Sequence, residues 1–348
     1  MKFYKQITFI LIVFFKTETL FSENNLFNVN NIKIEKKDKV TNDSLTDQAI
    51  KKGFNQLIKK ILLKEDLKTL SGLNFSAIKQ LVTYYQVSNI TEKDQNKEFV
   101  NFSITFDKEK IHDLFYKKGI SYSEILDKDL YVLPIFVKNE ELFVFNNNIF
   151  YKNWNNYHEN GLIEFILPLE NIEIIQNINA YKDNLINLNI VNLFDGYPNK
   201  NLALILIEEN KTGNIKIYIK ARIQEKDISK NLIFKQQKLF SDKNYKDIII
   251  ETNNELIDLV KSRNLIDIRT PSFLNARFNI DKKNNLVELN SRIKNIDAIE
   301  NIFVQDFNKD YMNLRIKYLG KLEKIISLLK TKNIDLNLNN DQWVIKTF

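Results

Sequence analysis

Residues 129–137 read Asp-Leu-Tyr-Val-Leu-Pro-Ile-Phe-Val, a run that is apolar at almost every position after Asp129. A short apolar run of this kind is typical of a strand that is buried inside a sheet. We therefore predict that it is the first strand of a central layered α/β domain, over residues 129–268. Two smaller α+β modules flank this domain, over residues 25–125 and 272–348.

The central domain contains further strand patterns with helices between them. The run Asn-Leu-Ala-Leu-Ile-Leu-Ile-Glu-Glu at residues 201–209 predicts a second strand that is buried on both faces. Strands are also expected at residues 142–145, 162–167, 214–222 and 232–239, and a helix at residues 248–260. Several strands separated by helices favour a layered α/β sheet.

The N-terminal module has the predicted order β-α-α-β-β-α. Its first helix follows Ser44 and Asp47, which are similar to a capping box, and Ile50, Phe54 and Leu57 keep helical spacing on one face. Lysines occupy much of the other face. This pattern favours a surface helix packed on a core. The alternative is a basic amphipathic helix that lies on anionic lipid.

The C-terminal module follows Pro271 and has the predicted order β-α-β-β-α-β, which is the ferredoxin-like arrangement. Its closing strand is expected at residues 343–348. One use of this fold is RNA binding through aromatic side chains on the third strand. The third strand, residues 311–318, would present a polar face of Asn313, Arg315 and Lys317 with Tyr311 at one end. The strand lacks the glycine-aromatic signature of RNA-binding modules. Two interpretations of the C-terminal module are therefore kept: a protein-docking module, or a stable end piece of the chain.

The composition limits the chemistry. The formal net charge of the 348 residues is +7, but lysine supplies most of the positive charge and arginine occurs only six times. Surfaces that bind phosphates rely largely on arginine, so we do not expect nucleic acid as a partner. Cysteine is absent, which excludes disulfides, thiolate metal sites and a cysteine nucleophile.

The N-terminus has the layout of a secretory signal peptide over residues 1–22. Lys2 and Lys5 precede an apolar core at residues 7–15, and Ser22 is a plausible cleavage point. The core is shorter than the roughly 20 residues that span a bilayer. We expect a periplasmic protein without a transmembrane segment after cleavage. The alternative is an uncleaved N-terminus that anchors the chain to the inner membrane.

Catalytic and metal-binding patterns are missing from the sequence. His112 and His158 have no cysteine or second histidine at ligand spacing, so we expect no metal site. Phosphate loops, dinucleotide-binding glycine patterns and Gly-x-Ser-x-Gly elbows do not occur. We therefore expect no cofactor and no enzyme activity. A hydrolase with dispersed carboxylates stays open as an alternative, because such a pair need not be close in sequence.

Aromatic side chains crowd one short segment of the central domain. The candidate binding residues there are Phe150, Tyr151, Trp154 and Tyr157. Such rings can stack on sugars or anchor a partner protein. The alternative is that they close one end of the hydrophobic core.

A set of short segments forms a recognisable pattern over residues 25–250. They are Ala-Ile-Lys-Lys-Gly-Phe in the first helix, Leu-Val-Thr-Tyr-Tyr at residues 81–85, Phe106-Asp107 before a helix ending at Gly119, Leu133-Pro134, and Leu167-Pro168-Leu169. The pattern resembles the bacterial domain-of-unknown-function family 2066 (DUF2066), exported proteins of the Gram-negative envelope. The family tends to place an Asn-Pro-Trp…Trp segment where this chain has Tyr151 and Trp154, so no residue role is carried over. The resemblance implies an exported protein with no known activity.

These observations favour a non-catalytic, exported protein that docks to or assembles with another envelope protein. The alternatives are a glycan- or lipid-binding module that uses the rings around Trp154, and the dispersed-carboxylate hydrolase.

Overall fold

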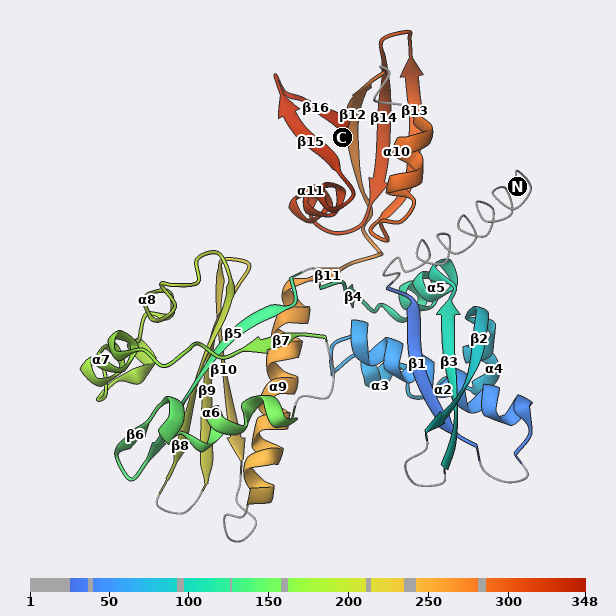
Figure 1. Cartoon of the computed structure of the whole chain (residues 1–348). Helices are drawn as coiled ribbons and strands as arrows, with labels where there is room; N and C mark the ends of the chain where they lie inside the picture. The colour runs from blue at the N-terminus through green and yellow to red at the C-terminus, as the bar shows by residue number, and fades with distance from the viewer. Residues whose placement is uncertain are drawn as a thin grey trace, which may run out of the picture. The chain divides into compact units, whose positions relative to one another are not determined.

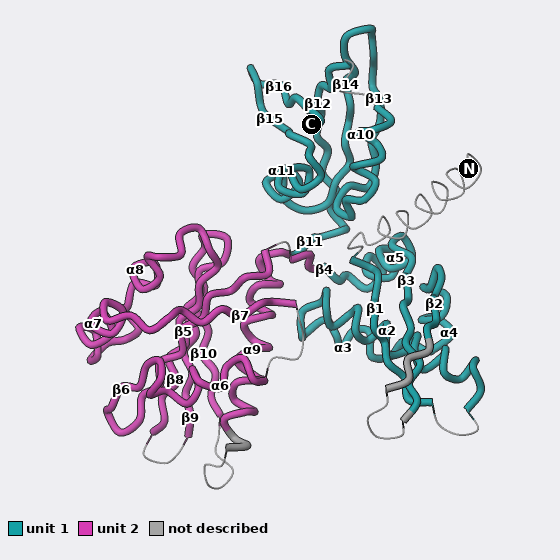
Figure 2. The backbone as a smooth tube through the Cα atoms, viewed as in Figure 1, with its two compact units in different colours: residues 1–122, 265–348 teal, residues 123–264 magenta. Residues whose placement is uncertain are grey.

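The computed structural model describes residues 26–36, 40–92, 97–125, 127–157, 162–210, 214–234, 242–280 and 286–348. The expected signal peptide lies outside these residues. The structure is 37% helical and 38% strand, so the predicted α+β class is confirmed. The chain forms two compact units: unit 1 contains residues 1–122 and 265–348, and unit 2 contains residues 123–264. Figure 2 shows unit 2 in magenta as a single insertion in the sequence of unit 1.

Unit 2 is built on a six-stranded sheet with the strand order β10-β9-β8-β5-β6, in which β7 also pairs with β5 (Figure 1). Its strands are β5 (Asp129–Lys138), β6 (Glu141–Phe143), β7 (Glu164–Ile166), β8 (Asn201–Glu209), β9 (Ile215–Ile223) and β10 (Lys226–Phe234). Its helices are η1 (Phe145–Asn147), α6 (Ile149–Asn153), η2 (Trp154–Tyr157), α7 (Ile172–Ala180), η3 (Leu185–Asn187), α8 (Ile190–Leu193) and α9 (Asp242–Arg263). The central strands β5 and β8 are parallel.

The sheet of unit 2 is buried on both faces, which is why β5 and β8 are apolar along nearly their whole length. One core cluster joins Leu130 and Val132 of β5 to Leu256 and Val260 of α9. A second cluster, on alternate residues of the same strands, joins Leu133 and Ile135 to helices α7 and α8. Because side chains alternate along a strand, the two clusters lie on opposite faces of the sheet.

Pro134 lies in the middle of β5 although proline cannot donate a ladder hydrogen bond. β5 pairs with β7 at residues 129–131 and with β6 at residues 136–138, so Pro134 falls in the gap between these two neighbours. The side chain of buried Asn148 enters this gap, and its Nδ2 donates to the carbonyl oxygen of Pro134 at 2.8 Å. Its Oδ1 accepts from the N–H of Phe150 at 2.9 Å and caps α6. One asparagine thus completes β5 and begins the next helix.

The first part of unit 1 is a three-stranded antiparallel sheet with the order β1-β3-β2. Its elements are β1 (Asn28–Glu35), α2 (Asn42–Ile61), α3 (Leu67–Leu70), α4 (Phe75–Gln80), β2 (Val82–Glu92), β3 (Lys97–Phe106) and α5 (Lys108–Lys118). Thr41 caps α2, which buries Ile50, Phe54 and Leu57 against the sheet. Gly53 of α2 lies so close to Ile32 of β1 that a Cβ atom added to Gly53 would lie 2.8 Å from the Cδ1 atom of Ile32.

The second part of unit 1 is a five-stranded sheet with the order β13-β14-β12-β16-β15 (Figure 1). Its elements are β12 (Ser272–Asn279), α10 (Leu286–Ile293), β13 (Ile299–Phe307), β14 (Tyr311–Tyr318), α11 (Leu322–Thr331), β15 (Ile334–Asn339) and β16 (Gln342–Thr347). Helices α10 and α11 bury Leu289 and Ile325 in one cluster with Leu274 and Leu314 of the sheet. The short strands β4 (Tyr122–Ser123) and β11 (Leu265–Ile266), where the chain passes between the units, pair with each other.

The end of the chain differs from the predicted single closing strand. β15 and β16 form a hairpin, and β16 inserts between β15 and β12, parallel to β12. The predicted strand at residues 232–239 is also displaced, because β10 is Lys226–Phe234. Among the described residues, none of the helices has the length and apolar character needed to cross a bilayer.

Candidate functional site

The four aromatic residues singled out from the sequence do not gather on one surface. Phe150 and Trp154 are 0% exposed and belong to the core beneath α9, where the Phe150 ring packs edge-on against Phe136 and Tyr245. Tyr151 packs against the other core, and its hydroxyl donates to the carbonyl oxygen of Pro168 at 2.7 Å. Burial raises the pKa of the Tyr151 hydroxyl, with a further contribution from Glu170. The fourth ring, Tyr157, is partly exposed, and the ammonium group of Lys246 lies over it. This placement favours the packing interpretation of the segment.

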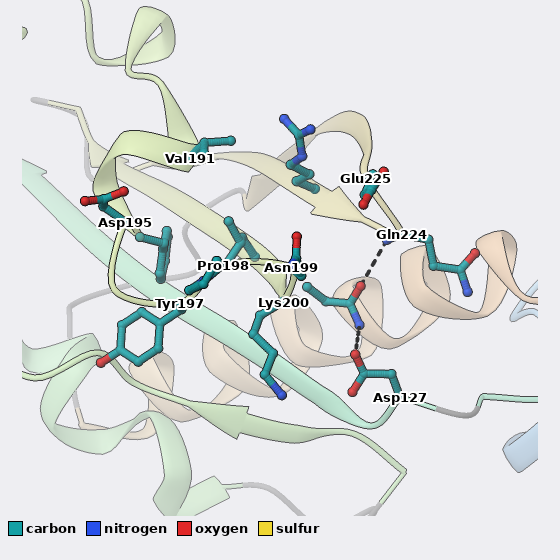
Figure 3. A pocket seen from close by; sticks show the side chains of 13 residues that line it. Asp127, Val191, Asp195, Tyr197, Pro198, Asn199, Lys200, Gln224 and Glu225 are labelled. Carbon is teal, nitrogen blue, oxygen red and sulfur yellow. Dashed lines mark hydrogen bonds between the residues drawn. The ribbon is translucent and has the colours of Figure 1, made fainter. Parts of the chain in front are cut away.

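A pocket of about 500 Å³ opens in unit 2 at the ends of the sheet where β5 and β8 begin (Figure 3). Its lining residues are Asp127, Val191, Phe194, Asp195, Tyr197, Pro198, Asn199, Lys200, Asn201, Leu202, Arg222, Gln224 and Glu225. Figure 3 shows Asp127 and Asp195 at opposite ends of the pocket, so these carboxylates do not converge. Within the described residues, no group of three or more His, Asp or Glu side chains could hold a metal ion.

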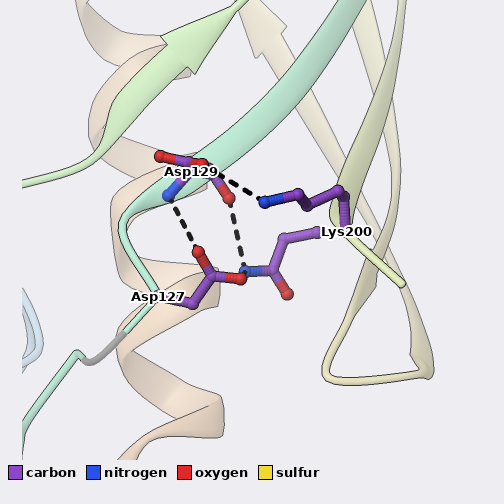
Figure 4. A network of polar contacts seen from close by, with 4 residues as sticks. Asp127, Asp129 and Lys200 are labelled. Carbon is purple, nitrogen blue, oxygen red and sulfur yellow. Dashed lines mark hydrogen bonds and ion pairs between the residues drawn. The ribbon is translucent and has the colours of Figure 1, made fainter. Parts of the chain in front are cut away.

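Several polar groups at the edge of this pocket form one network of contacts (Figure 4). Asn201, which is buried, donates through Nδ2 to Asp127 Oδ2 at 3.2 Å and accepts from the N–H of Gln224 at 3.0 Å. Lys200 Nζ lies 3.5 Å from Asp129 Oδ2. The network therefore ties the starts of β5 and β8 to the β9–β10 turn. Ligands of α/β sheets usually bind at the carboxyl ends of the parallel strands, and this pocket lies at the opposite ends. We assign it a structural role.

A different surface presents unpaired cationic groups: the face of the C-terminal sheet that α10 and α11 leave uncovered. Side chains alternate along β12, so Leu274 and Ala276 enter the core while Phe273 and Arg277 lie on the open face. On β14, Arg315 occupies the same face. The guanidinium of Arg315 lies 4.3 Å from the centre of the Phe273 ring, and that of Arg277 lies 4.3 Å from the centre of the Tyr311 ring. We call Phe273, Arg277, Tyr311 and Arg315 the stacked-arginine face.

These two arginines have no charged partner among the residues that the structure describes. Neither Arg277 nor Arg315 forms a side-chain ion pair or hydrogen bond with another described residue, whereas Arg222, Arg269 and Arg292 each pair with a carboxylate. A guanidinium that stacks on a ring keeps the N–H groups at its edge available for a carboxylate or phosphate. Of the neighbouring charges on the face, Lys317 Nζ lies 2.7 Å from Glu300 Oε2, and the Asp306 carboxylate accepts from Asn313 Nδ2 at 2.9 Å. Arg277 and Arg315 are therefore two cations of this face without an ion pair among the described residues; Lys346, exposed between the buried Ile345 and Thr347 of β16, is a third.

The sequence analysis identified Arg315 and Tyr311 on the open face but missed their partners. Arg277 lies opposite Asn313, and Asn275 lies opposite Arg315, in the antiparallel pairing of β12 with β14. Only this register shows that Phe273 is next to Arg315 and that Arg277 is next to Tyr311. The available signal was the alternation of Phe273 and Arg277 with the core residues of β12.

Comparison with known proteins gives no relative: no family model matches the chain, and no curated protein or solved structure matches it significantly.

Proposed function

We propose that this chain is an exported, periplasmic docking or assembly factor of the Gram-negative cell envelope, without catalytic activity, and that it docks through the stacked-arginine face. Export is supported by the signal-peptide pattern of residues 1–22 and by the resemblance to domain-of-unknown-function family 2066. The single observation that carries the docking role is the pair of unpaired guanidinium groups on an uncovered sheet.

The partner of this face is an acidic, extended protein segment. Arg277 and Arg315 are diagonal neighbours on adjacent strands, which sets their Cα atoms about 7–8 Å apart. Carboxylates two residues apart on an extended chain point to the same side and repeat every roughly 7 Å. Arg277 stacks on Tyr311, which lies opposite Asn279, and Arg315 stacks on Phe273, which lies opposite Lys317, so the two guanidinium groups lie further apart than the two Cα atoms. An extended segment with a carboxylate at every second residue can still bring one carboxylate to each guanidinium. Aromatic and arginine side chains are also the commonest anchors of protein interfaces.

The charge balance of the module supports an acidic partner. Residues 272–348 contain 13 lysines and arginines and 9 aspartates and glutamates, a formal net charge of +4. Single-stranded nucleic acid fits less well, because bases stack on open aromatic faces. Here a guanidinium already covers one face of both Phe273 and Tyr311.

The proposal also includes a division of the chain into three modules. We propose that the chain comprises an N-terminal β-α-α-β-β-α module, a central layered α/β domain and a C-terminal ferredoxin-like module whose last strand is replaced by the β15–β16 hairpin. The observed order of strands, with β12 between β14 and β16, supports the ferredoxin-like assignment. The glycan- and lipid-binding alternative loses its support at Trp154, since a fully buried indole ring offers no stacking surface.

The test measures binding of a fluorescent nine-residue peptide with glutamate at alternate positions. We expect micromolar affinity that weakens with added salt and falls at least tenfold in the double variant Arg277→Gln/Arg315→Gln. The matched control, Arg222→Gln/Arg269→Gln, removes the same charge elsewhere and should bind as the unmodified protein does. A peptide with glutamine in place of glutamate should not bind.

Two results would overturn the proposal. If the control variant loses as much affinity as the double variant, binding depends on net charge rather than on this face. If a single-stranded oligonucleotide binds and the acidic peptide does not, the face recognises nucleic acid.

A further inference from the structure

β2 forms an outer edge of the three-stranded sheet in unit 1. It runs for 11 residues, from Val82 to Glu92, and pairs with β3 on one side only. Along its other side, half of its backbone N–H and C=O groups point away from the sheet. An edge of this length is a template on which another strand can pair.

The sequence of β2 lacks the features that normally prevent such pairing. Proteins protect sheet edges with charged residues, prolines or bulges. β2 contains no charged residue before Glu92, no proline, and one register shift at its very start, between Val82 and Tyr84.

The other edges of the described sheets are protected. β10 carries Lys226, Asp227 and Lys230. β13 has two register shifts, and β1 has one shift as well as Lys33. β15 carries Asp335, and β6 is only three residues long. Among the described edge strands, β2 is thus long, nearly regular and without charge up to its last residue, Glu92.

β2 also leaves apolar side chains uncovered on the core face of its sheet. Tyr85 lies opposite Ile104, and Val87 lies opposite Phe102, in the β2–β3 pairing. Ile104 and Phe102 are buried, yet Tyr85 is 48% exposed and Val87 is 52% exposed. The apolar face that α2 covers over β1 and β3 therefore continues, without cover, across β2. An edge with free backbone groups and an uncovered apolar side is suited to a strand that brings apolar side chains of its own.

We propose that β2 pairs antiparallel with β2 of a second copy of this chain, so that two three-stranded sheets join into one of six strands. A two-fold axis perpendicular to the sheet brings the same face of both copies to the same side. With the axis at Gln86, Tyr85 lies opposite Val87 of the second copy. Aromatic and β-branched side chains form favourable cross-strand pairs.

The uncharged sequence selects a second copy over a charged partner. In antiparallel pairing about Gln86, each residue lies opposite the residue at the same distance on the other side of Gln86 in the second copy, and like charges at two such positions would repel. In this register the two Glu92 residues lie roughly 40 Å apart at 3.4 Å per residue, and all the residues between them are neutral. This inference concerns a surface separate from the stacked-arginine face and does not depend on the acidic-segment proposal.

The first test is the mass of the purified full chain by sedimentation equilibrium over 1–200 µM. We expect a reversible dimer, and we expect Val87→Lys to raise its dissociation constant at least tenfold, because each dimer would then bury two ammonium groups beside apolar side chains. The matched control is Ile233→Lys on the β10 edge, where the side chain is 69% exposed; its dissociation constant should be unchanged.

The second test uses the absence of cysteine from the sequence. Gln86→Cys should form a disulfide-linked dimer on mild oxidation, because two residues at the axis face each other across the paired strands. Ile233→Cys should not. A chain that is monomeric at 200 µM would overturn the proposal, as would a dimer that persists in Val87→Lys and crosslinks equally through both cysteines.

Discussion

At the scale of single residues, His112 of unit 1 has a pKa far below the ordinary value for histidine. It lies on α5, stacked on the Tyr122 ring and edge-on to Phe27. Burial, with a smaller contribution from Lys108, lowers its pKa from 6.5 to about 4, although Glu300 and Asp113 act in the opposite direction. Its Nε2 atom is buried and has no hydrogen-bond partner among the described residues. His112 is therefore neutral in the folded protein across most of the acidic range.

We predict that this histidine makes the stability of unit 1 depend on pH between about 6.5 and 4. As the pH falls through this window, the unfolded chain binds a proton at His112 and the folded chain does not. The free energy of unfolding therefore decreases, by up to about 3 kcal/mol. Urea unfolding at a series of pH values should show this loss, and His112→Phe should remove it.

Asp297, in the same unit, is a second buried titratable group whose effect on the pH dependence of stability can be compared with that of His112. Burial raises the pKa of this carboxyl, so it contributes to stability with the opposite sign, and it is unchanged in the histidine variant. An unaltered pH profile in His112→Phe would show that other groups cause the loss.

At the scale of elements, Asn148 links β5 to α6. Replacing it with alanine leaves the buried carbonyl oxygen of Pro134 without its donor and removes the cap of α6. We predict that Asn148→Ala lowers the free energy of unfolding by about 3 kcal/mol. Asn171→Ala is the matched control, since the exposed Asn171 only caps α7 through the N–H of Glu173, and it should cost about 1 kcal/mol. Chemical denaturation followed by tryptophan fluorescence measures both, and equal losses would contradict the role of Asn148 in β5.

The sequence predicted secondary structure best for strands that are covered on both faces of a sheet. The apolar run at residues 201–209 predicted β8 with its bounds, because a strand covered on both faces buries every residue and a run of this length suits a strand better than a helix. The hairpins were harder to predict because the chain has only seven glycines. Gln224 and Glu225 adopt positive φ at the β9–β10 turn without the usual glycine signal, so β10 was predicted too late. Asn340 and Asp341 do the same between β15 and β16, and the overlooked turn explains the missed strand β15.

The candidate sites were less predictable than the elements. Apolarity alone cannot tell whether the rings of Phe150 and Trp154 point inward, because short helices have no clear period. The stacking of Arg277 on Tyr311 depends on the register of two strands that are separated by more than 30 residues in the sequence. Such a contact exists only after the sheet has formed.

At the scale of the whole molecule, the two core clusters of unit 2 contain only residues from 123–264. Unit 2 therefore has what an independent domain needs. We predict that a fragment of residues 123–264 folds alone, with one cooperative unfolding transition and dispersed amide signals in NMR spectra. Ile205→Asp, which buries a charge in the sheet, should abolish that transition. A fragment that binds hydrophobic dyes and exchanges all its amides rapidly would show that unit 2 depends on unit 1.

The insertion of unit 2 into unit 1 also sets an order of events during synthesis. The core of unit 1 combines residues 27–122 with residues 266–345, so its first half leaves the ribosome long before its second half. Unit 2 is complete in between. A nascent chain stopped near residue 264 would thus carry a finished domain beside an apolar surface that still lacks its partner. Chaperones and proteases act on such surfaces, and the final quarter of the chain decides when unit 1 escapes them.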